Sequence, residues 1–555
     1  MKHIRKITGV IVKYTETLNP NIFAAAIFFL FFILPFLAIK AGTMEGDMAE
    51  YLNNPLRIIH GELPYREFWL LFPPGEVLFP ALVYKLFGLN INLVLLISIV
   101  FSSLCGLLTF IIGRKLTGSN IFATLLAFMV YYDGLIRYYY GPAYDHLDFF
   151  FLLVATLFYL EYLSKKQGLF LFLVGISVGM AFFFRLYEVG PAAIAFLVSL
   201  YFNSRYNRKT VSFITKEILF YLSGIVLPLI IITFFLFDIW RPMFFGVIVD
   251  SISHGTSMKI PFYHESFEAF NRVKEILLSG RKTSIIALAG GLIYSCIALL
   301  KDVTASLTPF IVVICSAWYL IRKKFDGHEM TIVLLFLTWG ILSLPKALGR
   351  SDLMHLASST TPLFFVIIML LQKSMHLKNS IKLRGDKLVS ITLVILCCFS
   401  LLSFTSYVKN TYDLVKNNKF EVKSGTGQLF FNNSEDACNA NKVIWYIIQN
   451  TGPGDYIFVT PWFAPPFYAL TNRKDPTYYD SLIDVVARPS EDKQNSICNG
   501  LSRKKTKLII HNTQWGFDDK EELQFSYSCK VLQRFIDSNY KLVEQFGRYG
   551  IYVPK

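Results

Sequence analysis

The stretch ILFYLSGIVLPLIIITFFLF, residues Ile218–Phe237, decides the fold class of this chain, because it runs for 20 residues without a charged side chain. About 20 apolar residues are what an α-helix needs to cross the hydrocarbon core of a bilayer. The stretch IFAAAIFFLFFILPFLAI, residues Ile22–Ile39, has the same character near the N-terminus. A signal peptide would have a shorter apolar core and a small-residue cleavage site, so we expect an uncleaved first span here.

The composition places the chain among membrane proteins. Of its 555 residues, 54% are hydrophobic and 17% are charged, and the mean hydropathy is +0.46. Soluble domains carry about 25% charged residues, and a single soluble core could not absorb 52 Phe and 30 Tyr. The net charge of +15 would indicate nucleic acid on a soluble protein, but the basic residues here lie in short connections between apolar blocks. We therefore expect a lipid bilayer around the protein and no nucleic-acid partner.

Apolar blocks of spanning length recur over the first 406 residues. The candidate spans are 22–40, 92–112, 120–136, 148–163, 168–184, 189–203, 217–237, 306–321, 330–345, 357–372 and 388–406. Segment 284–300 is also apolar enough to cross. Either it lies in the interface or inside the bundle, or a further crossing within Trp240–Ser253 accompanies it. The sequence thus predicts an all-α polytopic membrane domain over residues 1–406 with 11 or 13 transmembrane helices, and 11 is preferred.

Lys and Arg are distributed unequally between the two sets of connections. With the N-terminus inside, the inside connections hold 20 of these residues and the short outside connections hold six. Positive residues concentrate on the cytoplasmic side of membrane proteins. We therefore expect an integral protein of the plasma (inner) membrane with a cytoplasmic N-terminus and with residues 407–555 outside.

The character of the chain changes near Asn432. Segments 455–460, 507–511 and 550–553 have the pattern of strands, and segments 443–449 and 529–538 have the pattern of helices. We expect a linker over 407–431 and a small extracytoplasmic α/β domain over 432–555 that docks substrate or caps the site. An oxidising compartment would allow two of Cys438, Cys498 and Cys529 to pair and leave one thiol over.

The loop 41–91 carries a dense set of polar residues between two spans. It reads GDMAEY from Gly46, GELPYREFW from Gly61 and FPPG from Phe72. Asp47 and Glu50 lie three residues apart and would share one face of a helix. A carboxylate just above the membrane can take a proton from an acceptor hydroxyl, or it can simply belong to a solvated acidic loop. The apolar run Val77–Phe87 is too short to span and predicts an interfacial helix.

A second outside loop ends in Tyr144-Asp145-His146-Leu147-Asp148. An Asp-His-x-Asp cluster can bind a divalent cation, or its acids can cap the following helix, where negative charge is favourable. We assign Asp145, His146 and Asp148 to a second acidic site. No metal site or cofactor is predicted from this pattern, and the use of a divalent cation is left open.

Two further turns combine basic and acidic residues between apolar segments. Arg185 and Glu188 interrupt the apolar run Leu169–Phe202. Arg185 can hold a phosphate oxygen, or it can pair with Glu188 and mark the turn. The later turn contains Lys346, Arg350, Asp352 and His355. There Arg350 can bind phosphate while Asp352 and His355 orient the substrate, or the turn can be a snorkelling basic helix end.

Under the expected orientation, all four polar loops open on the same side of the membrane. Ionisable groups at membrane depth are functional candidates, and one shared site explains the four loops together. We expect Asp47, Asp145, Arg185 and Arg350 to meet in one pocket at the external membrane boundary.

These motifs resemble a known family. A carboxylate-bearing first loop, Gly-x-x-Pro-Tyr-Arg-x-Phe from Gly61, Pro-Pro-Gly at Pro73–Gly75 and a helix ending in Leu-Phe-Gly at Leu86–Gly88 are similar to the GT-C superfamily of membrane glycosyltransferases. The bacterial branch related to protein O-mannosyltransferases and to aminoarabinose transferases of lipid A is most similar. The resemblance covers the first 200 residues best, and the layout with an outer C-terminal domain also fits.

The resemblance implies roles for several residues. A first-loop acid is the catalytic base in this family, and Asp47 matches by position, with Glu50 second, because Asp47 is followed by Met48 rather than by Glu. Asp145 matches a second acidic residue, and Arg185 matches a basic residue that contacts the carrier phosphate. We add Arg66 and Arg350 as phosphate-binding candidates, and Tyr65, Glu188, Asp352 and His355 as substrate-orienting candidates.

The implied activity is sugar transfer from a polyprenyl-phosphate carrier to a hydroxyl of a glycan, glycolipid or protein, with inversion and Asp47 as general base. A Trp-Trp-Asp tripeptide is absent from the outer domain, which argues against transfer to asparagine. The alternatives are a transporter or flippase of lipid-linked sugars, or a non-catalytic glycan-binding membrane protein. Transporters place polar groups near the bilayer midplane in repeated halves, whereas the charges here lie at the ends of the spans.

Overall fold

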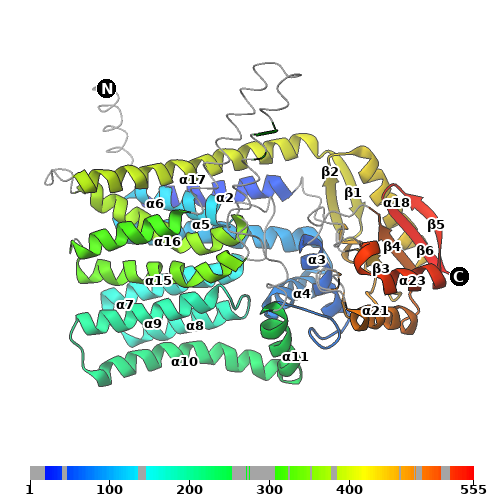
Figure 1. Ribbon diagram of the computed structural model, residues 1–555, viewed down its shortest axis with the longest axis horizontal. Coiled ribbons are helices and arrows are strands. Elements are labelled where there is room, and N and C mark those ends of the chain that lie inside the picture. The colour runs from blue at the N-terminus through cyan, green and yellow to red at the C-terminus, as the bar shows by residue number, and fades with distance from the viewer. Residues whose placement is uncertain are drawn as a thin grey trace, which may run out of the picture.

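The computed structural model describes residues 19–39, 47–135, 146–252, 271, 274–275, 307–322, 325–349, 353–376, 384–461, 464–479, 482, 485, 490–513 and 525–555. Within them the chain forms a helical bundle, two loop helices at one end of the bundle, and a C-terminal α/β domain beside those loop helices (Figure 1).

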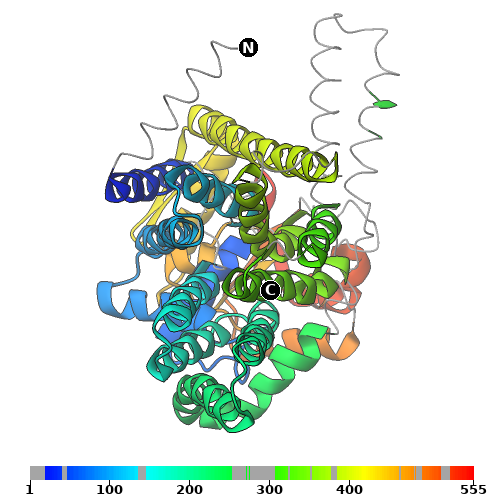
Figure 2. The ribbon, with the colours of Figure 1, turned by 90° about the vertical axis from the view of Figure 1, so that its left-hand side faces the viewer.

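Long helices lie side by side and run in roughly the same direction to make the bundle (Figures 1 and 2). They are α2 (Pro20–Ile39), α5 (Ile91–Thr117), α6 (Asn120–Phe128) continued by the π-helical η1 (Met129–Leu135), α7 (His146–Lys165), α8 (Gly168–Phe182), α9 (Val189–Tyr206), α10 (Val211–Phe235), the helix Leu307–Ile321, α15 (Gly327–Gly349), α16 (Leu353–His376) and α17 (Arg384–Asn417). Each of the 11 expected spans coincides with one of these helices.

Five of the described helices are long and apolar enough to cross a membrane by themselves. They are Pro20–Ile39, Ile91–Thr117, His146–Lys165, Val211–Phe235 and Gly327–Lys346. Exposed apolar side chains on α10, such as Ile230, Phe234 and Phe235, face outward from the bundle, as expected where lipid replaces water. The chain is therefore an integral membrane protein.

The segment 240–252 does not run beside α10 as a second crossing would. After the short 3-10 turn η2 (Phe237–Ile239), the chain forms α11 (Trp240–Phe244) and the π-helical η3 (Phe245–Asp250). α11 stands at a steep angle to α10 at the bundle end near the C-terminal domain (Figure 1). Ser251 Oγ donates to Leu71 O at 2.7 Å, so this segment packs on the 41–91 loop. The apolar segment 284–300 lies outside the described residues.

Glycines allow two bundle helices to pack with their backbones close together. A Cβ added at Gly175 of α8 would lie 2.1 Å from Tyr221 O of α10, and one at Gly224 of α10 would lie 2.2 Å from Phe172 O of α8. Small residues of this kind let membrane helices approach closely, where van der Waals contact stabilises them in lipid. This packing fixes α8, and with it the turn that follows α8.

Near the start of α10, the buried carboxylate of Glu217 connects three helices. Glu217 accepts hydrogen bonds from Tyr162 of α7, from Ser204 Oγ of α9 at 2.5 Å and from Lys209 Nζ at 2.5 Å. A buried ion pair of this kind is stable when further hydrogen bonds satisfy the carboxylate. Glu217 therefore has a structural role, because its carboxylate is bonded to side chains of the protein itself.

The two loop helices lie between the bundle and the C-terminal domain (Figure 1). They are α3 (Asp47–Ile59) and α4 (Gly75–Phe87). The run Val77–Phe87 is thus confirmed as a helix, α4, and its interfacial position stays a prediction. Tyr51 of α3 exchanges a hydrogen bond with Ser98 of α5 at 3.0 Å, and Tyr84 of α4 donates to Leu52 O at 3.1 Å. These contacts fix both loop helices on the end of α5.

A four-stranded sheet with order β3-β4-β6-β5 forms the centre of the C-terminal domain. Its strands are β3 (Ile457–Thr460), parallel to β4 (Leu508–Asn512), and then β6 (Tyr549–Pro554) and β5 (Tyr540–Phe546), each antiparallel to its neighbour. The helices of the domain are α18 (Ser434–Asn450), α19 (Phe467–Thr471), α21 (Glu491–Arg503), α22 (Phe525–Ser528) and α23 (Lys530–Asn539). The three expected strands and both expected helices are therefore present.

The expected linker over 407–431 differs from what the structure shows. α17 continues to Asn417, and a hairpin follows, made of β1 (Phe420–Ser424) and β2 (Gly427–Phe431). Strand β5 also lacked a sequence signal, because five of its seven residues are exposed and mostly polar. Cys438, Cys498 and Cys529 are free thiols, and Cys438 is exposed while the other two are buried, so the considered disulfide is not formed.

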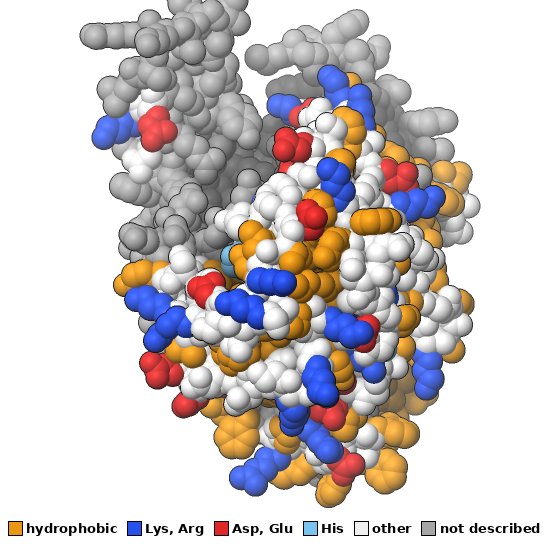
Figure 3. All heavy atoms as spheres, turned by 90° about the vertical axis from the view of Figure 1, so that its right-hand side faces the viewer, with side chains coloured by type: hydrophobic (Ala, Val, Ile, Leu, Met, Phe, Trp, Pro, Cys, Tyr) orange, Lys and Arg blue, Asp and Glu red, His pale blue; other side chains and the backbone are white. Residues whose placement is uncertain are grey.

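The C-terminal domain packs directly on the bundle end through a continuous apolar core. Tyr51, Leu52 and Leu95 from the loop and α5 belong to the same buried cluster as Leu429 and Phe467 from the domain. The backbone N–H of Ile91 donates to Thr426 O at 3.0 Å, which joins the start of α5 to the β1–β2 hairpin. On the face turned away from the bundle, basic and acidic side chains are interspersed, as on a solvated surface (Figure 3).

Candidate active site

The helix α3 presents a polar stripe toward the C-terminal domain. Glu50, Asn53, Asn54 and Arg57 lie at the spacing that places residues on one helix face, and all four line a cleft between α3 and the domain. The buried Leu52 lies on another face of α3, and the buried Leu56 also lines the cleft. Asp47, the expected base, begins α3, but its side chain lies outside the described residues.

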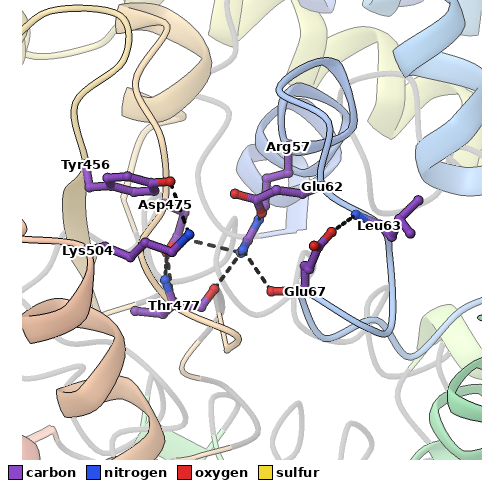
Figure 4. Close-up of polar contacts among 8 residues, drawn as sticks. All are labelled: Arg57, Glu62, Leu63, Glu67, Tyr456, Asp475, Thr477 and Lys504. Atoms are coloured by element: carbon purple, nitrogen blue, oxygen red, sulfur yellow. Dashed lines mark hydrogen bonds and ion pairs between the residues drawn. The ribbon is translucent and has the colours of Figure 1, made fainter.

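Arg57 forms a polar connection between α3 and the C-terminal domain (Figure 4). Its Nε contacts Glu62 Oε2 at 2.6 Å, and its Nη2 donates to Thr477 O at 2.7 Å and to Glu67 O at 3.2 Å. The guanidinium carbon also lies 4.8 Å from the centre of the Phe68 ring. Because these acceptors come from both sides of the junction, Arg57 holds the loop and the domain in one arrangement.

Two ionisable neighbours of Arg57 are perturbed by burial. Burial raises the pKa of Glu62 above its ordinary value, and the Arg57 guanidinium opposes that rise. Burial lowers the pKa of His60, while the hydrogen bond between His60 Nε2 and Asn472 Oδ1 at 3.1 Å works in the opposite direction. The surroundings of Arg57 therefore disfavour the charged forms of both Glu62 and His60.

Tyr65 stabilises the loop between α3 and α4. It is buried with φ of +62°, which is uncommon for a residue with a side chain. Its hydroxyl donates to Phe72 O, and its carbonyl accepts from the Tyr478 hydroxyl at 3.0 Å. The residue expected to orient substrate thus orders the loop in this structure, whereas the neighbouring Arg66 is exposed.

Arg185 lies at the end of α8 and contacts the first turn of α4. Its Nε lies 2.6 Å from Glu76 Oε1, both side chains are less than a tenth exposed, and the guanidinium carbon lies 4.1 Å from the centre of the Phe72 ring. The Gly75 N–H donates to Phe183 O at 2.9 Å, and a Cβ at Gly75 would lie 2.5 Å from that oxygen. The Pro-Pro-Gly motif therefore lets α4 approach the Arg185 turn.

Arg185 does not pair with Glu188, which was one of the two roles considered for it. Glu188 instead contacts Lys346 near the end of α15, so it links two turns that the sequence placed together. The carboxylate beside Arg185 is Glu76, which sequence analysis missed. The only signal was a single acid at the start of an apolar helix, and an N-terminal acid is also what an ordinary helix prefers.

The Arg185–Glu76 pair lies close to α3. Burial, and after it the Glu76 carboxylate, raise the pKa of Tyr51 on α3 and that of Tyr65 in the loop. Glu76 is thus within electrostatic reach of the helix that begins at Asp47 and carries Glu50. The structure therefore places α3, α4 and the Arg185 turn beside one another at one end of the bundle.

His146 and Asp148 of the expected second acidic site are both buried at the start of α7. The Cys105 thiol of α5 contacts His146 O at 3.4 Å. In the part of the chain that the structure describes, no three His, Cys, Asp or Glu side chains are grouped to hold a metal ion. Asp145, Arg350 and Asp352 and the side chain of His355 lie outside the described residues, so the convergence of Asp47, Asp145, Arg185 and Arg350 stays a prediction.

Comparisons with known proteins bear on the fold and on part of the sequence. Residues 72–237 match the profile of the family described as dolichyl-phosphate-mannose-protein mannosyltransferase. No curated protein sequence matches the chain. The structure of ArnT from Cupriavidus metallidurans bound to undecaprenyl phosphate is similar with a TM-score of 0.53 at 10% identity, over 95% of this chain and 97% of that chain.

A second solved structure is the archaeal oligosaccharyltransferase AglB from Archaeoglobus fulgidus in complex with an inhibitory peptide and a dolichol-phosphate. It has a TM-score of 0.48 at 12% identity, over 96% of this chain and 74% of that chain. The segment that matches the mannosyltransferase family profile, residues 72–237, includes Phe72, Glu76 and Arg185. The profile match and the fold shared with ArnT confirm the expected resemblance, and this chain is an integral membrane protein with the GT-C fold of membrane glycosyltransferases.

Proposed function

We propose that this protein transfers a sugar from a polyprenyl-phosphate carrier to a hydroxyl acceptor at the outer membrane face. The observation that carries the proposal is the buried Arg185–Glu76 pair on the Phe72 ring, at the bundle end where α3 begins. This pair lies inside the segment that matches the mannosyltransferase family profile. A buried cation at a membrane boundary is costly unless it has a partner or a function.

The proposed reaction is a single displacement with inversion. The acceptor oxygen attacks the anomeric carbon, its proton passes to the carboxylate of Asp47, and the bond between the anomeric carbon and the phosphate oxygen breaks. The polyprenyl phosphate leaves with the electron pair of that bond. General-base catalysis of this kind typically contributes about 10²–10⁴-fold to the rate.

Each named residue has a part in this proposal. Asp47, or Glu50 three residues later, is the base, because both lie on the helix next to the Arg185–Glu76 pair. Arg185 contacts the carrier phosphate and stabilises its negative charge as it leaves, together with Arg350. Glu76 is a positioning residue, because it holds Arg185 at Nε while the Phe72 ring supports the plane of the guanidinium.

The test uses purified full-length protein in lipid nanodiscs and polyprenyl-phosphate sugar that is radiolabelled in the sugar. We expect the label to leave the carrier, by transfer to a hydroxyl acceptor or to water, with inverted anomeric configuration. Carrier binding without loss of label would contradict the proposal and would support a glycan-binding protein. Movement of the intact carrier between leaflets of a proteoliposome, again without loss of label, would support a flippase.

A further inference from the structure

The cleft between α3 and the C-terminal domain has a mixed lining, in which apolar residues alternate with polar side chains from both partners. Glu50, Asn53, Asn54 and Arg57 line it from α3, and Arg473 and Asp475 line it from the domain. Asn54, Arg57, Arg473 and Asp475 are all at least nine-tenths buried. Buried polar groups are costly unless they are hydrogen-bonded, so such a lining requires an explanation.

The charges of the cleft balance, and its cations are already held. The lining contains two carboxylates, Glu50 and Asp475, and two guanidinium groups, Arg57 and Arg473. Arg57 contacts Glu62 and Thr477 O, and Arg473 donates from Nε to Thr451 Oγ1 at 2.7 Å and from Nη2 to Thr451 O at 2.5 Å. An anionic ligand would therefore have to displace a bonded partner of one of these arginines.

Asn54 supplies the cleft with a buried oxygen acceptor. No hydrogen bond reaches Asn54 Oδ1 among the described residues, although this atom is buried. Asp475 Oδ1 accepts from the N–H and the hydroxyl of Thr477, both at 2.7 Å, whereas its Oδ2 lies 4.0 Å from Arg57 Nη1, which is beyond hydrogen-bonding distance. By contrast, the neighbouring Asn53 already uses its Oδ1 to accept from the Ala469 N–H at 3.1 Å. A ligand that fits Asn54 must therefore bring a hydrogen-bond donor.

The size of the cleft limits what enters it. Its free volume is about 40 Å³, enough for a few water-sized groups but not for a whole sugar ring. A hydroxyl group is a neutral donor of the right size. An ammonium group fits less well, because it would be repelled by the two guanidinium groups of the lining.

We infer that this cleft is an acceptor subsite, in which Asn54 and Asp475 receive one or two hydroxyl groups of a neutral, hydroxyl-rich acceptor such as a glycan. The inference rests on the proposed function, and it names the class of acceptor. The polar stripe of α3 joins this subsite to the helix end that begins at Asp47, so one helix serves both the acceptor and the proposed base.

The experiment measures transfer from the labelled carrier to two soluble probes, methyl β-glucoside and its anionic counterpart, methyl β-glucuronide. We compare the wild type with Asn54→Leu, which keeps the size of the side chain and removes its oxygen, and with Asn54→Asp, which keeps an acceptor. We expect the wild type to prefer the neutral probe. In Asn54→Leu the half-saturating concentration of methyl β-glucoside rises tenfold or more. This fold-change is at least five times the fold-change in the half-saturating concentration of the carrier.

Two controls separate misfolding from loss of the subsite. Asn450→Ala changes an exposed asparagine of α18 whose side chain bonds Tyr446 O, and it leaves both half-saturating concentrations unchanged. Asn54→Asp retains binding of the neutral probe within about threefold, because an oxygen acceptor is kept. Equal half-saturation for wild type and Asn54→Leu, or preference of the wild type for the glucuronide, would overturn the inference.

A carrier that loses no label would count against the proposed function and not against the subsite. In that case, saturation-transfer NMR of methyl β-glucoside with the full-length protein in nanodiscs replaces transfer as the readout. Wild-type binding that Asn54→Leu reduces tenfold supports the subsite, and absence of binding to the wild type rejects it.

Discussion

Two buried arginines of this protein, Arg57 and Arg185, each contact a carboxylate and an aromatic ring, and Arg57 in addition donates to backbone oxygens. Arg57 donates to the backbone oxygens of Glu67 and Thr477, which belong to the loop and to the C-terminal domain. Arg185 contacts a carboxylate, that of Glu76, and an aromatic ring. Backbone oxygens cannot leave a guanidinium without local unfolding of the chain. A side-chain carboxylate, by contrast, can be displaced from the guanidinium by another anion. From this difference we propose a structural role for Arg57 and a ligand-binding role for Arg185.

The largest effect is expected at the proposed base, which gives the Arg185 region its chemistry. Asp47→Asn removes the proton acceptor and lowers the transfer rate by about 10²–10⁴-fold, while carrier binding stays within about twofold. Glu50→Gln tests the second candidate, and Glu67→Gln, an exposed acid of the same loop, is the control. If Asp47→Asn keeps wild-type turnover and Glu50→Gln does not, the base is Glu50.

Breaking the contacts of Arg57 is expected to loosen the docking of the C-terminal domain. Arg57→Ala leaves Glu62 and Asp475 buried without the guanidinium, and removal of one partner of a buried ion pair costs about 3–5 kcal/mol. Hydrogen exchange of the Trp69 N–H, which donates to Tyr478 O at 2.8 Å, reports on this junction. We expect faster exchange in Arg57→Ala and no change in Arg66→Ala, an exposed arginine of the same loop. Unchanged exchange in Arg57→Ala would remove the structural role.

Arg185 is expected to act on the carrier more than on domain docking. Hydrogen bonds to charged groups contribute about 1.5–3 kcal/mol, so Arg185→Ala weakens carrier binding by about 10–100-fold. Arg185→Lys keeps the charge without the planar fork and falls between Ala and wild type. Trp69 exchange serves as the docking control. Normal carrier binding by a folded Arg185→Ala protein would contradict the phosphate role.

Glu76→Gln sharpens the same comparison, because it keeps the shape of the partner and removes its charge. We expect carrier affinity to stay within about threefold or to increase, since a negative charge beside the phosphate is lost. Turnover is expected to fall several-fold, because the guanidinium loses its ionic partner. Separate measurement of carrier Kd and kcat distinguishes these effects. A loss of affinity as large as that of Arg185→Ala would mean that Glu76 only supports the fold of the turn.

The smallest expected effect is a pH dependence at the Arg57 junction. Burial lowers the pKa of His60 from 6.5, so its contribution to docking is present above pH 6.5 and is lost as the pH falls through the folded-state value. Burial raises the pKa of Glu62, whose contribution has the opposite sign. His60→Gln isolates the histidine. The advantage of wild type over His60→Gln in Trp69 exchange should shrink between pH 7.5 and 5.5, and a constant advantage would exclude His60.

Much of the helical architecture could be predicted from the sequence, because long apolar runs and charged turns are local signals. All 11 expected spans are helices, and so is the short apolar run 77–87. The hairpin over 420–431 and strand β5 were not predicted, because their residues alternate weakly and are stabilised by contacts with α5 and β6. Such tertiary stabilisation has no local sequence signal.

The site was predictable only in part, for a related reason. Arg185 and Glu188 were recognised as charges inside an apolar run, but their partners Glu76 and Lys346 are more than 100 residues away along the chain. Pairing over such distances depends on how helices pack, and spacing along the sequence does not encode it. The contacts of Arg57 with Thr477 and Asp475 could not be anticipated for the same reason.

Photo-crosslinking of the carrier tests the central claim most directly. A polyprenyl phosphate with a diazirine next to the phosphate is bound to the full-length protein in nanodiscs, irradiated, and the modified peptides are mapped by mass spectrometry. The account predicts label within residues 72–76 or 183–188, around the Arg185–Glu76 pair, and loss of that label in Arg185→Ala. Label that gathers instead at the other end of the bundle, around Lys209 and Glu217, would contradict it.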